Sequence, residues 1–288
     1  MATPKLKIFA HHQRDWRDNR YVYPVVSRRS GGLSIGINLN PDTACNFDCV
    51  YCCVDRTVEP RYRRVELDLV RVELERMLDL AASGALFSEP PLDQTPSRLR
   101  RLNDVAFSGN GEPTAYRRFG EACHLVADVL AARNLRDVKI VVITNATLFH
   151  RPAVADALRF LDDHNGEIWA KLDAGAQEYY ARVERTTIPL SRVVDNIILA
   201  ARLRPLVIQS LFITLDGVGP DDIEVEAYVA RLRQIVSAGG RIKLVQVYTV
   251  ARRTAESNVG AMDDAALDAI AAKARATGVA VETYYGLG

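Results

Sequence analysis

The sequence lacks any long apolar run. None of its hydrophobic stretches approaches the roughly 20 consecutive apolar residues that a membrane-spanning helix needs, so we expect no membrane segment. The first residues, Met1 to Lys7, contain no apolar core of the kind found in secretory signals, and we therefore expect a cytoplasmic protein. Neither sign of charge is in clear excess, because the sequence has 37 Lys and Arg residues and 36 Asp and Glu residues. Bulk charge therefore predicts neither a nucleic acid nor a membrane as partner.

Cysteine is scarce and unevenly placed. Four of the five cysteines lie within one short segment, at Cys45, Cys49, Cys52 and Cys53. A disulfide scaffold would distribute its cysteines to join loops, whereas a tight cluster indicates a metal site. The fifth, Cys123, lies in an apolar helical pattern, and we interpret it as a small buried hydrophobe. Because no second cysteine cluster follows, we expect no auxiliary metal centre.

Strand-like and helix-like patterns alternate along the chain. The strand candidates are short runs rich in Val, Ile, Leu and Phe, as in parallel strands buried on both faces. They are 34–39, 104–108, 139–144, 168–173, 207–215, 243–249 and a short 279–284. Amphipathic helix candidates between them are 65–82, 116–133, 152–161, 191–203, 223–238 and 262–276. This alternation predicts an α/β fold of repeated βα units with parallel strands.

About six βα units fit the chain, fewer than the eight of a complete barrel. We therefore predict a partial, open (β/α)6 TIM-like barrel over residues 34–288, with the Pro-rich segment 87–98 as an irregular connection inside it. Residues 1–33 fit no such unit and are dense in arginine and aromatic residues, and we interpret them as an arm that packs across the barrel. The same composition could instead bind RNA. The adjacent His11 and His12 make a poor metal site.

The spacing of the clustered cysteines carries most of the chemical information. Soft thiolates select iron–sulfur clusters, zinc or Cu(I). Three thiolates on one loop, at Cys45, Cys49 and Cys52, can hold three corners of a [4Fe–4S] cluster and leave one iron open. Zinc is the alternative, with Cys53 as a fourth ligand, but zinc usually takes separated pairs and these neighbours would have to point the same way. We predict that Cys53 is not a ligand, although a spare thiol could serve substrate chemistry.

A glycine-rich turn follows the predicted strand 104–108. Residues 108–114 are Ser-Gly-Asn-Gly-Glu-Pro-Thr, in which Gly109 and Gly111 let the backbone turn tightly and approach a ligand closely. Main-chain groups freed at the end of the strand could then bind an amino group. Taken alone, such a turn is most often only a connection from strand to helix.

Polar residues stand at the ends of three further predicted strands. They are Thr144 and Asn145, then Lys171 and Asp173, then Gln246. Since active sites of barrel enzymes lie at the carboxyl ends of the strands, these side chains are candidates for a site. Thr144 and Asn145 could instead be turn or cap residues. Lys171 and Asp173, two residues apart on one face, could instead form an internal ion pair.

Together these motifs resemble those of the radical S-adenosylmethionine (SAM) superfamily. The C-x3-C-x2-C loop with an aromatic residue, Tyr51, before its last cysteine resembles the family signature, and residues 108–114 resemble its glycine-rich SAM-binding element. The order of motifs over about residues 34–250 is similar to that of the wyosine-synthase-related Fe–S oxidoreductases. The extra cysteines and the flavodoxin-like domain of wyosine synthases themselves are not evident.

The resemblance implies a set of cofactor contacts. A [4Fe–4S] cluster would be bound by Cys45, Cys49 and Cys52, and its open iron would bind the amino and carboxylate groups of SAM. The SAM contacts implied are Tyr51, Gly109, Asn110, Gly111, Glu112, Thr144, Asn145, Lys171, Asp173 and Gln246. No protein side chain is assigned a catalytic role, because the cofactor supplies the chemistry.

The resemblance also implies a reaction. A low-potential donor of flavodoxin or ferredoxin type would reduce the cluster, and SAM would be cleaved to methionine and a 5′-deoxyadenosyl radical that abstracts hydrogen from a substrate. The substrate could be a small molecule, a peptide or an RNA, and the near-zero net charge favours a substrate other than nucleic acid. The alternatives are transfer of a methyl or other group from SAM, tRNA modification included, and an Fe–S sensor without turnover.

Overall fold

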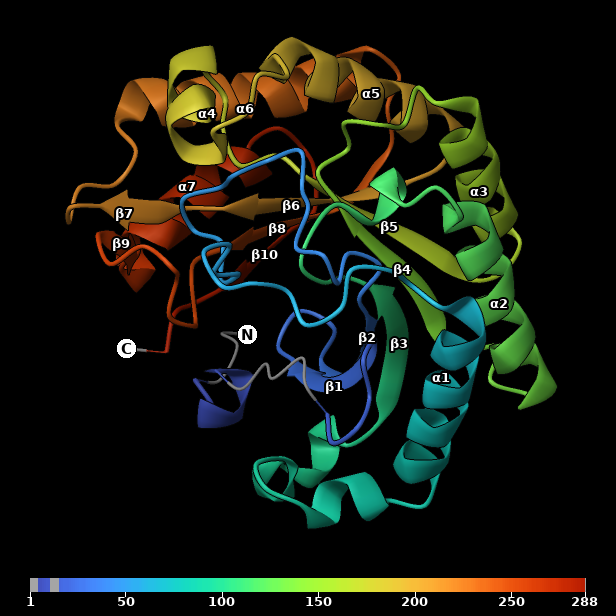
Figure 1. Cartoon of the computed structure of the whole chain (residues 1–288). Coiled ribbons are helices and arrows are strands. Elements are labelled where there is room, and N and C mark those ends of the chain that lie inside the picture. Colours follow the sequence, from blue (N-terminus) through green and yellow to red (C-terminus); the bar gives the residue numbers. More distant parts are fainter. Residues whose placement is uncertain (1–4, 11–15, 288) are drawn as a thin grey trace.

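A sheet curled into a half-barrel, with helices on its outer side, organises the protein (Figure 1). The computed structural model describes residues 5–10 and 16–287. In that part of the chain the sheet has eight strands in the order β1-β2-β3-β4-β5-β6-β8-β10. β1 pairs antiparallel with β2, and every other neighbouring pair is parallel. β1 and β10 form the two edges, so the barrel is open.

The strands of this sheet come from the apolar runs of the sequence. They are β1 (Val22–Ser27), β2 (Gly32–Ile37), β3 (Leu102–Phe107), β4 (Lys139–Thr144), β5 (Gly166–Lys171), β6 (Leu206–Leu211), β8 (Ile242–Tyr248) and β10 (Val281–Tyr284). Every residue of β6 is buried, as expected for a parallel strand covered on both faces. The predicted strand 139–144 is β4 itself, and the other predicted ranges overlap one strand or more with shifted ends.

Helices pack against the outer face of the sheet. They are α1 (Leu67–Ala82), α2 (Phe119–Ala132), α3 (Pro152–Asp162), α4 (Gln177–Glu184), α5 (Leu190–Leu203), α6 (Asp222–Ser237) and α7 (Asp264–Arg275). In α1 the buried residues Val70, Leu74 and Met77 recur every three or four positions, which places them on one side of the helix. Each predicted helix overlaps one of these helices. The predicted α/β partial (β/α)6 barrel is therefore confirmed.

Local sequence signals explain where several helices begin. The Asp221 carboxylate accepts a hydrogen bond from the Glu224 amide at 2.8 Å and caps α6. The Asp263 carboxylate caps α7 in the same way through the Ala266 amide. Pro152 is the first residue of α3, where its missing N–H costs no hydrogen bond. These residues therefore set the positions at which the loops end and the helices begin.

Two elements differ from the expectation. The predicted strand 207–215 is two strands, because β6 ends at Leu211 and β7 (Ile213–Leu215) leaves the main sheet to pair with β9 (Val259–Ala261). A continuous apolar run carries no signal for such a change of partner. The short helix α4 was not predicted at all, since its eight residues are largely polar. It nevertheless contacts the cysteine loop, as described below.

The region before residue 34 contributes to the sheet itself. β1 lies within it, and β2 begins at Gly32. Tyr21 and Tyr23 are fully buried and Trp16 is nearly so, so these rings belong to the core and are not exposed for stacking on bases. The division into an arm (1–33) and a barrel (34–288) stays a prediction. His11 and His12 lie outside the described residues.

The remaining segments agree with simple expectations. The Pro-rich stretch 87–98 is irregular and contains short 3-10 turns, Leu92–Gln94 and Ser97–Leu99 among them. In the part of the chain that the structure describes, we find no helix with the length and apolar character needed to cross a membrane.

Candidate functional site

The three motif cysteines lie on one loop at the carboxyl edge of the parallel strands. Cys45, Cys49 and Cys52 are each partly buried and line a cavity of about 290 Å3, which we call the cysteine-side cavity. Segments that follow β3, β4, β6 and β8 complete its wall. Because the carboxyl ends of parallel strands meet at one edge, residues far apart in sequence converge here.

The end of α4 holds the cysteine loop in place. The amide of Asp48 donates to the Glu184 carbonyl at 3.1 Å, and the amide of Val50 donates to the Val183 carbonyl at 2.9 Å. Phe47 packs edge-on against Tyr180, with ring centroids 5.9 Å apart. These contacts order the backbone between the first and last cysteine. The sequence carried no motif that pointed to α4.

A buried carboxylate stands directly behind one cysteine. The Cys49 thiol donates to the Glu184 carboxylate at 2.6 Å, and the Tyr51 hydroxyl donates to the other oxygen of that carboxylate at 2.8 Å. Burial, and then the nearby Asp173, raise the pKa of Glu184 to about 8. Burial and Glu184 also raise the pKa of the Cys49 thiol, and burial raises that of Cys45. Loading a metal would therefore displace protons from these thiols.

The predicted pair Lys171 and Asp173 forms an ion pair beside this carboxylate. The Lys171 ammonium lies 2.8 Å from the Asp173 carboxylate and 4.6 Å from the Tyr51 ring centroid. Burial alone would lower the pKa of Lys171, but Asp173 outweighs it and the pKa is raised well above its usual value. Asp173 also lies within hydrogen-bond distance of the Tyr51 hydroxyl and accepts from the Leu211 amide. Lys171 lines the cavity, and Asp173 lies one layer behind it.

The glycine-rich turn approaches the cysteine loop so closely that a side chain would collide. A Cβ at Gly111 would stand 2.0 Å from the Ala44 carbonyl oxygen, and one at Gly109 would stand 2.3 Å from the Asn38 amide oxygen. Both contacts are far inside normal van der Waals distance. Glycine is therefore required at these positions for close approach, and the turn and the cysteine loop form one wall.

Glu112 lines the cavity, but its carboxylate is occupied by the protein. It is 2% exposed, and it accepts from the Thr114 amide and hydroxyl, from the Thr144 hydroxyl at 2.7 Å and from the Asn145 amide at 2.8 Å. Burial raises its pKa in spite of these donors. The carboxylate thus joins the turn after β3 to the end of β4. A direct contact of Glu112 with SAM stays a prediction.

An amide network joins the cysteine loop to the end of β4. The Asn145 amide nitrogen donates to the Asn46 amide oxygen at 2.7 Å, and the Asn46 nitrogen donates to the Thr147 hydroxyl at 2.7 Å. Asn145 lines the cavity, whereas Thr144 lies behind it. Asn46, to which the sequence assigned no role, positions the loop between the first two cysteines.

One arginine near the cysteines was missed by sequence reasoning. The Arg56 guanidinium lies 3.4 Å from the Cys52 sulfur and 3.4 Å from the Asn110 carbonyl oxygen. It therefore joins the cysteine loop to the glycine-rich turn. Its position, four residues beyond the last cysteine, is the only signal that could have suggested it.

The structure brings most predicted site residues to one cavity. Cys45, Cys49, Cys52, Tyr51, Gly109, Asn110, Gly111, Glu112, Asn145 and Lys171 line it, while Thr144 and Asp173 stand behind. Gln246 lies elsewhere: it accepts from the Gln209 amide at 2.8 Å and lines a second cavity deeper in the barrel. Its assignment to SAM stays a prediction. Cys123 is fully buried in α2, as expected of a small hydrophobe.

The donor set suits an iron–sulfur cluster. Among the described residues, no three His, Cys, Asp or Glu side chains converge closely enough to hold a single metal ion. Three thiols at separate points of one wall match a cluster in which each iron takes one thiolate. The neighbouring Cys53 is exposed, and zinc would require four ligands about one point. The residues therefore fit a cluster with three protein ligands.

Comparison with known proteins identifies the family. The model of the radical SAM superfamily matches residues 39–228. The chain belongs to this superfamily. The match covers the cysteine loop, the glycine-rich turn and the strand ends through β7. Members bind a [4Fe–4S] cluster and SAM, and both expectations for this chain rest on the family and on the cavity described above.

The protein is also similar to individual relatives. A "UPF0026 protein" of Helicobacter pylori is 24% identical over 74% of this chain and 61% of its own length. A "UPF0026 protein" of Methanocaldococcus jannaschii is 30% identical over 52% of this chain and 42% of its own length. The chain thus spans less than two thirds of these relatives.

Solved structures show a similar fold. A radical SAM methyltransferase from Sphaerobacter thermophilus superposes with a TM-score of 0.59 over 89% of this chain and 67% of its own, at 15% identity. An archaeal TYW1 gives a TM-score of 0.41 over 72% of this chain and 62% of its own, at 14% identity. The first likeness supports the half-barrel fold and nothing finer.

Proposed function

We propose that this protein binds a [4Fe–4S] cluster through Cys45, Cys49 and Cys52 and cleaves SAM reductively to abstract hydrogen from a substrate. The observation that carries the proposal is that the three thiols and the turn at Gly109 and Gly111 line one cavity. When bound and reduced, the cluster supplies the electron that splits SAM into methionine and a 5′-deoxyadenosyl radical. Three protein thiolates leave one iron for SAM.

The surrounding side chains support this chemistry by position and charge. The Arg56 guanidinium beside Cys52 joins the cysteine loop to the glycine-rich turn. Gly109 and Gly111 leave main-chain groups free to approach the amino group of SAM. Tyr51, buried between Lys171 and Glu184, closes the wall and helps to exclude water.

The same proposal implies an electron donor, a place within the superfamily and a route of entry for the substrate. An external low-potential donor of flavodoxin or ferredoxin type would deliver the electron, since no second cysteine cluster is present in the sequence. Within the superfamily we place the chain near the wyosine-synthase-related oxidoreductases, on the order of its motifs. The substrate would enter from the open side of the half-barrel, between β1 and β10.

A cysteine series tests the ligand set. Iron and sulfide are measured in anaerobically reconstituted Cys45→Ala, Cys49→Ala and Cys52→Ala, with Cys53→Ala as matched control. We expect about four irons per chain in the parent and in Cys53→Ala, and loss of the cluster in the other three. Complete loss in Cys53→Ala, or a full complement of iron in any of the three, would contradict the assignment.

A further inference from the structure

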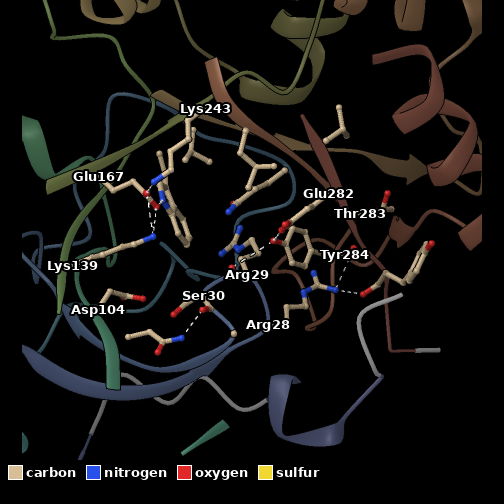
Figure 2. Close-up of a pocket in the computed structure, with 18 of the residues that line it drawn as sticks. Arg28, Arg29, Ser30, Asp104, Lys139, Glu167, Lys243, Glu282, Thr283 and Tyr284 are labelled. Carbon is tan, nitrogen blue, oxygen red and sulfur yellow. Dashed lines mark hydrogen bonds and ion pairs between the residues drawn. The ribbon is translucent and has the colours of Figure 1, made fainter. Parts of the chain in front are cut away.

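A second and larger cavity occupies the interior of the half-barrel. It has a volume of about 780 Å3 and reaches the amino-terminal ends of the strands, where Lys139, Glu167 and Lys243 line it (Figure 2). The hairpin between β1 and β2 forms another wall. Four residues border both this interior cavity and the cysteine-side cavity: Arg28, Arg29, Asp104 and Trp169. The two cavities are therefore neighbours.

Arg29 stands at this border and packs against two aromatic rings. Its guanidinium carbon lies 4.5 Å from the Tyr248 ring centroid and 5.9 Å from that of Trp169. Within residues 5–10 and 16–287, no hydrogen-bond acceptor or carboxylate pairs with its side chain. A guanidinium presents five N–H donors in a planar fork that matches carboxylate and phosphate oxygens. Two aromatic rings hold the fork in place and leave these donors for a ligand.

The neighbouring charges add to the positive potential at this point. Arg28 donates to the main-chain carbonyl of Tyr284 (Figure 2) and to those of Thr249 and Tyr285, so its charge meets no carboxylate in the described structure. Burial, together with the adjacent Arg29, lowers the pKa of Arg28 to about 9, which leaves it charged at neutral pH.

On the opposite wall one carboxylate is shared by two ammonium groups. Lys139 and Lys243 both pair with Glu167, so one positive charge is left over (Figure 2). Among the facing acids, Glu282 accepts from the Tyr284 hydroxyl and Asp104 from the Ser34 hydroxyl. The whole wall carries Arg28, Arg29, Arg101, Lys139, Lys243 and Arg275 against Asp104, Asp137, Glu167, Asp268 and Glu282. The two signs of charge nearly balance along this wall, so net charge does not select a ligand. The fork of Arg29, which has no acceptor among the described residues, does.

We propose that Arg29 binds the carboxylate or phosphate group of the substrate, which is therefore a small acid held in the interior cavity. The proposal deepens the function proposed above and rests on it. The cavity volume falls in the range of small-molecule sites. Gln246, which lines the same cavity, provides a neutral polar contact. Because the anchor borders both cavities, the acid group would lie close to the cysteine-side cavity.

Trp169 provides a direct reporter of binding. The chain has two tryptophans, so Trp16→Phe leaves Trp169 as the sole source of tryptophan fluorescence. The metal-free Trp16→Phe protein is titrated with inorganic phosphate and separately with succinate, at constant ionic strength. We expect a saturable change with at least one probe, and a response to only one of them would distinguish a phosphate ester from a carboxylic acid.

Three further substitutions in that background test the anchor. Arg29→Gln is expected to weaken binding at least tenfold, and Arg29→Lys, which keeps the charge but loses the fork, at least threefold. Arg101→Gln is the matched control, because Arg101 is an exposed arginine of the same cavity. It should change the affinity by no more than about twofold.

The proposal is overturned if the parent shows no saturable change, if Arg29→Gln and Arg101→Gln weaken binding equally, or if both Arg29 variants bind like the parent. Should Arg29→Gln fail to fold, Arg29→Lys decides alone. Failure here is distinct from failure of the proposed function. The titration needs no cluster, whereas the proposed function is tested separately by formation of 5′-deoxyadenosine in the reconstituted parent without substrate.

Discussion

Replacing Gly111 by alanine tests the close approach of the glycine-rich turn to the cysteine loop. The added Cβ would stand 2.0 Å from the Ala44 carbonyl oxygen and 2.9 Å from the Asn40 Cβ. A normal C···O contact is about 3.3 Å, so the two backbones must separate by roughly 1 Å. No side-chain rotation can relieve a contact with a carbonyl oxygen. Such overpacking costs about 1–3 kcal/mol of stability.

The same shift is expected to weaken the binding of SAM. Ala44 precedes the first cysteine, so the shift moves the proposed cluster relative to the groups that are proposed to bind SAM. A misplacement of about 1 Å can cost on the order of a hundredfold, and we expect SAM affinity to fall ten- to a hundredfold, or about 1.4–2.8 kcal/mol. Equilibrium binding of SAM to anaerobically reconstituted protein measures this, and urea unfolding of the metal-free protein measures the stability.

Gly120→Ala is the matched control. A Cβ there meets only the Ala157 Cβ, at 3.9 Å, an ordinary contact. Gly120 lies in the first turn of α2, where alanine is preferred over glycine by up to about 1 kcal/mol. We expect unchanged SAM affinity and equal or higher stability. The reasoning fails if Gly111→Ala binds SAM like the parent, or if Gly120→Ala loses affinity to the same extent.

Two further substitutions test contacts that hold the site together. Glu112→Ala removes an acceptor shared by two buried amides and two hydroxyls. Each unsatisfied group costs about 1–3 kcal/mol, so urea unfolding should show the metal-free protein destabilised by roughly 3–5 kcal/mol. A loss below about 1 kcal/mol would show that water replaces the carboxylate. Arg28→Gln removes the hydrogen bonds from the β1–β2 hairpin to the ends of β8 and β10. Hydrogen exchange of the β10 amides should become about tenfold faster or more. Unchanged exchange would mean that Arg28 does not hold the edges of the barrel together.

Much of the site could be predicted because its signals are local. The cysteine spacing, the glycine-rich turn and the polar strand ends each lie within a few residues, and the barrel topology brings them to one edge. Most of the predicted positions accordingly line a single cavity. The repeated apolar runs likewise predicted the parallel strands β2 to β6, β8 and β10, since burial on both faces leaves a simple pattern.

The parts that could not be predicted depend on contacts across long stretches of sequence. Glu184 approaches Cys49 only because the unpredicted helix α4 packs on the cysteine loop. Asn46 meets Asn145 through a pairing that no motif marks. Gln246 belongs to β8, but its depth along the strand decides which cavity it lines. These details depend on how distant segments of the chain pack against one another, which cannot be read from a single sequence.

Formation of 5′-deoxyadenosine tests the central claim most directly. The anaerobically reconstituted protein, with about four irons per chain, is reduced with dithionite in the presence of SAM, and the products are separated. We predict 5′-deoxyadenosine and methionine in equal amounts from the parent and from Cys53→Ala, and neither from Cys49→Ala. A reduced protein that holds its cluster but leaves SAM intact would contradict the account.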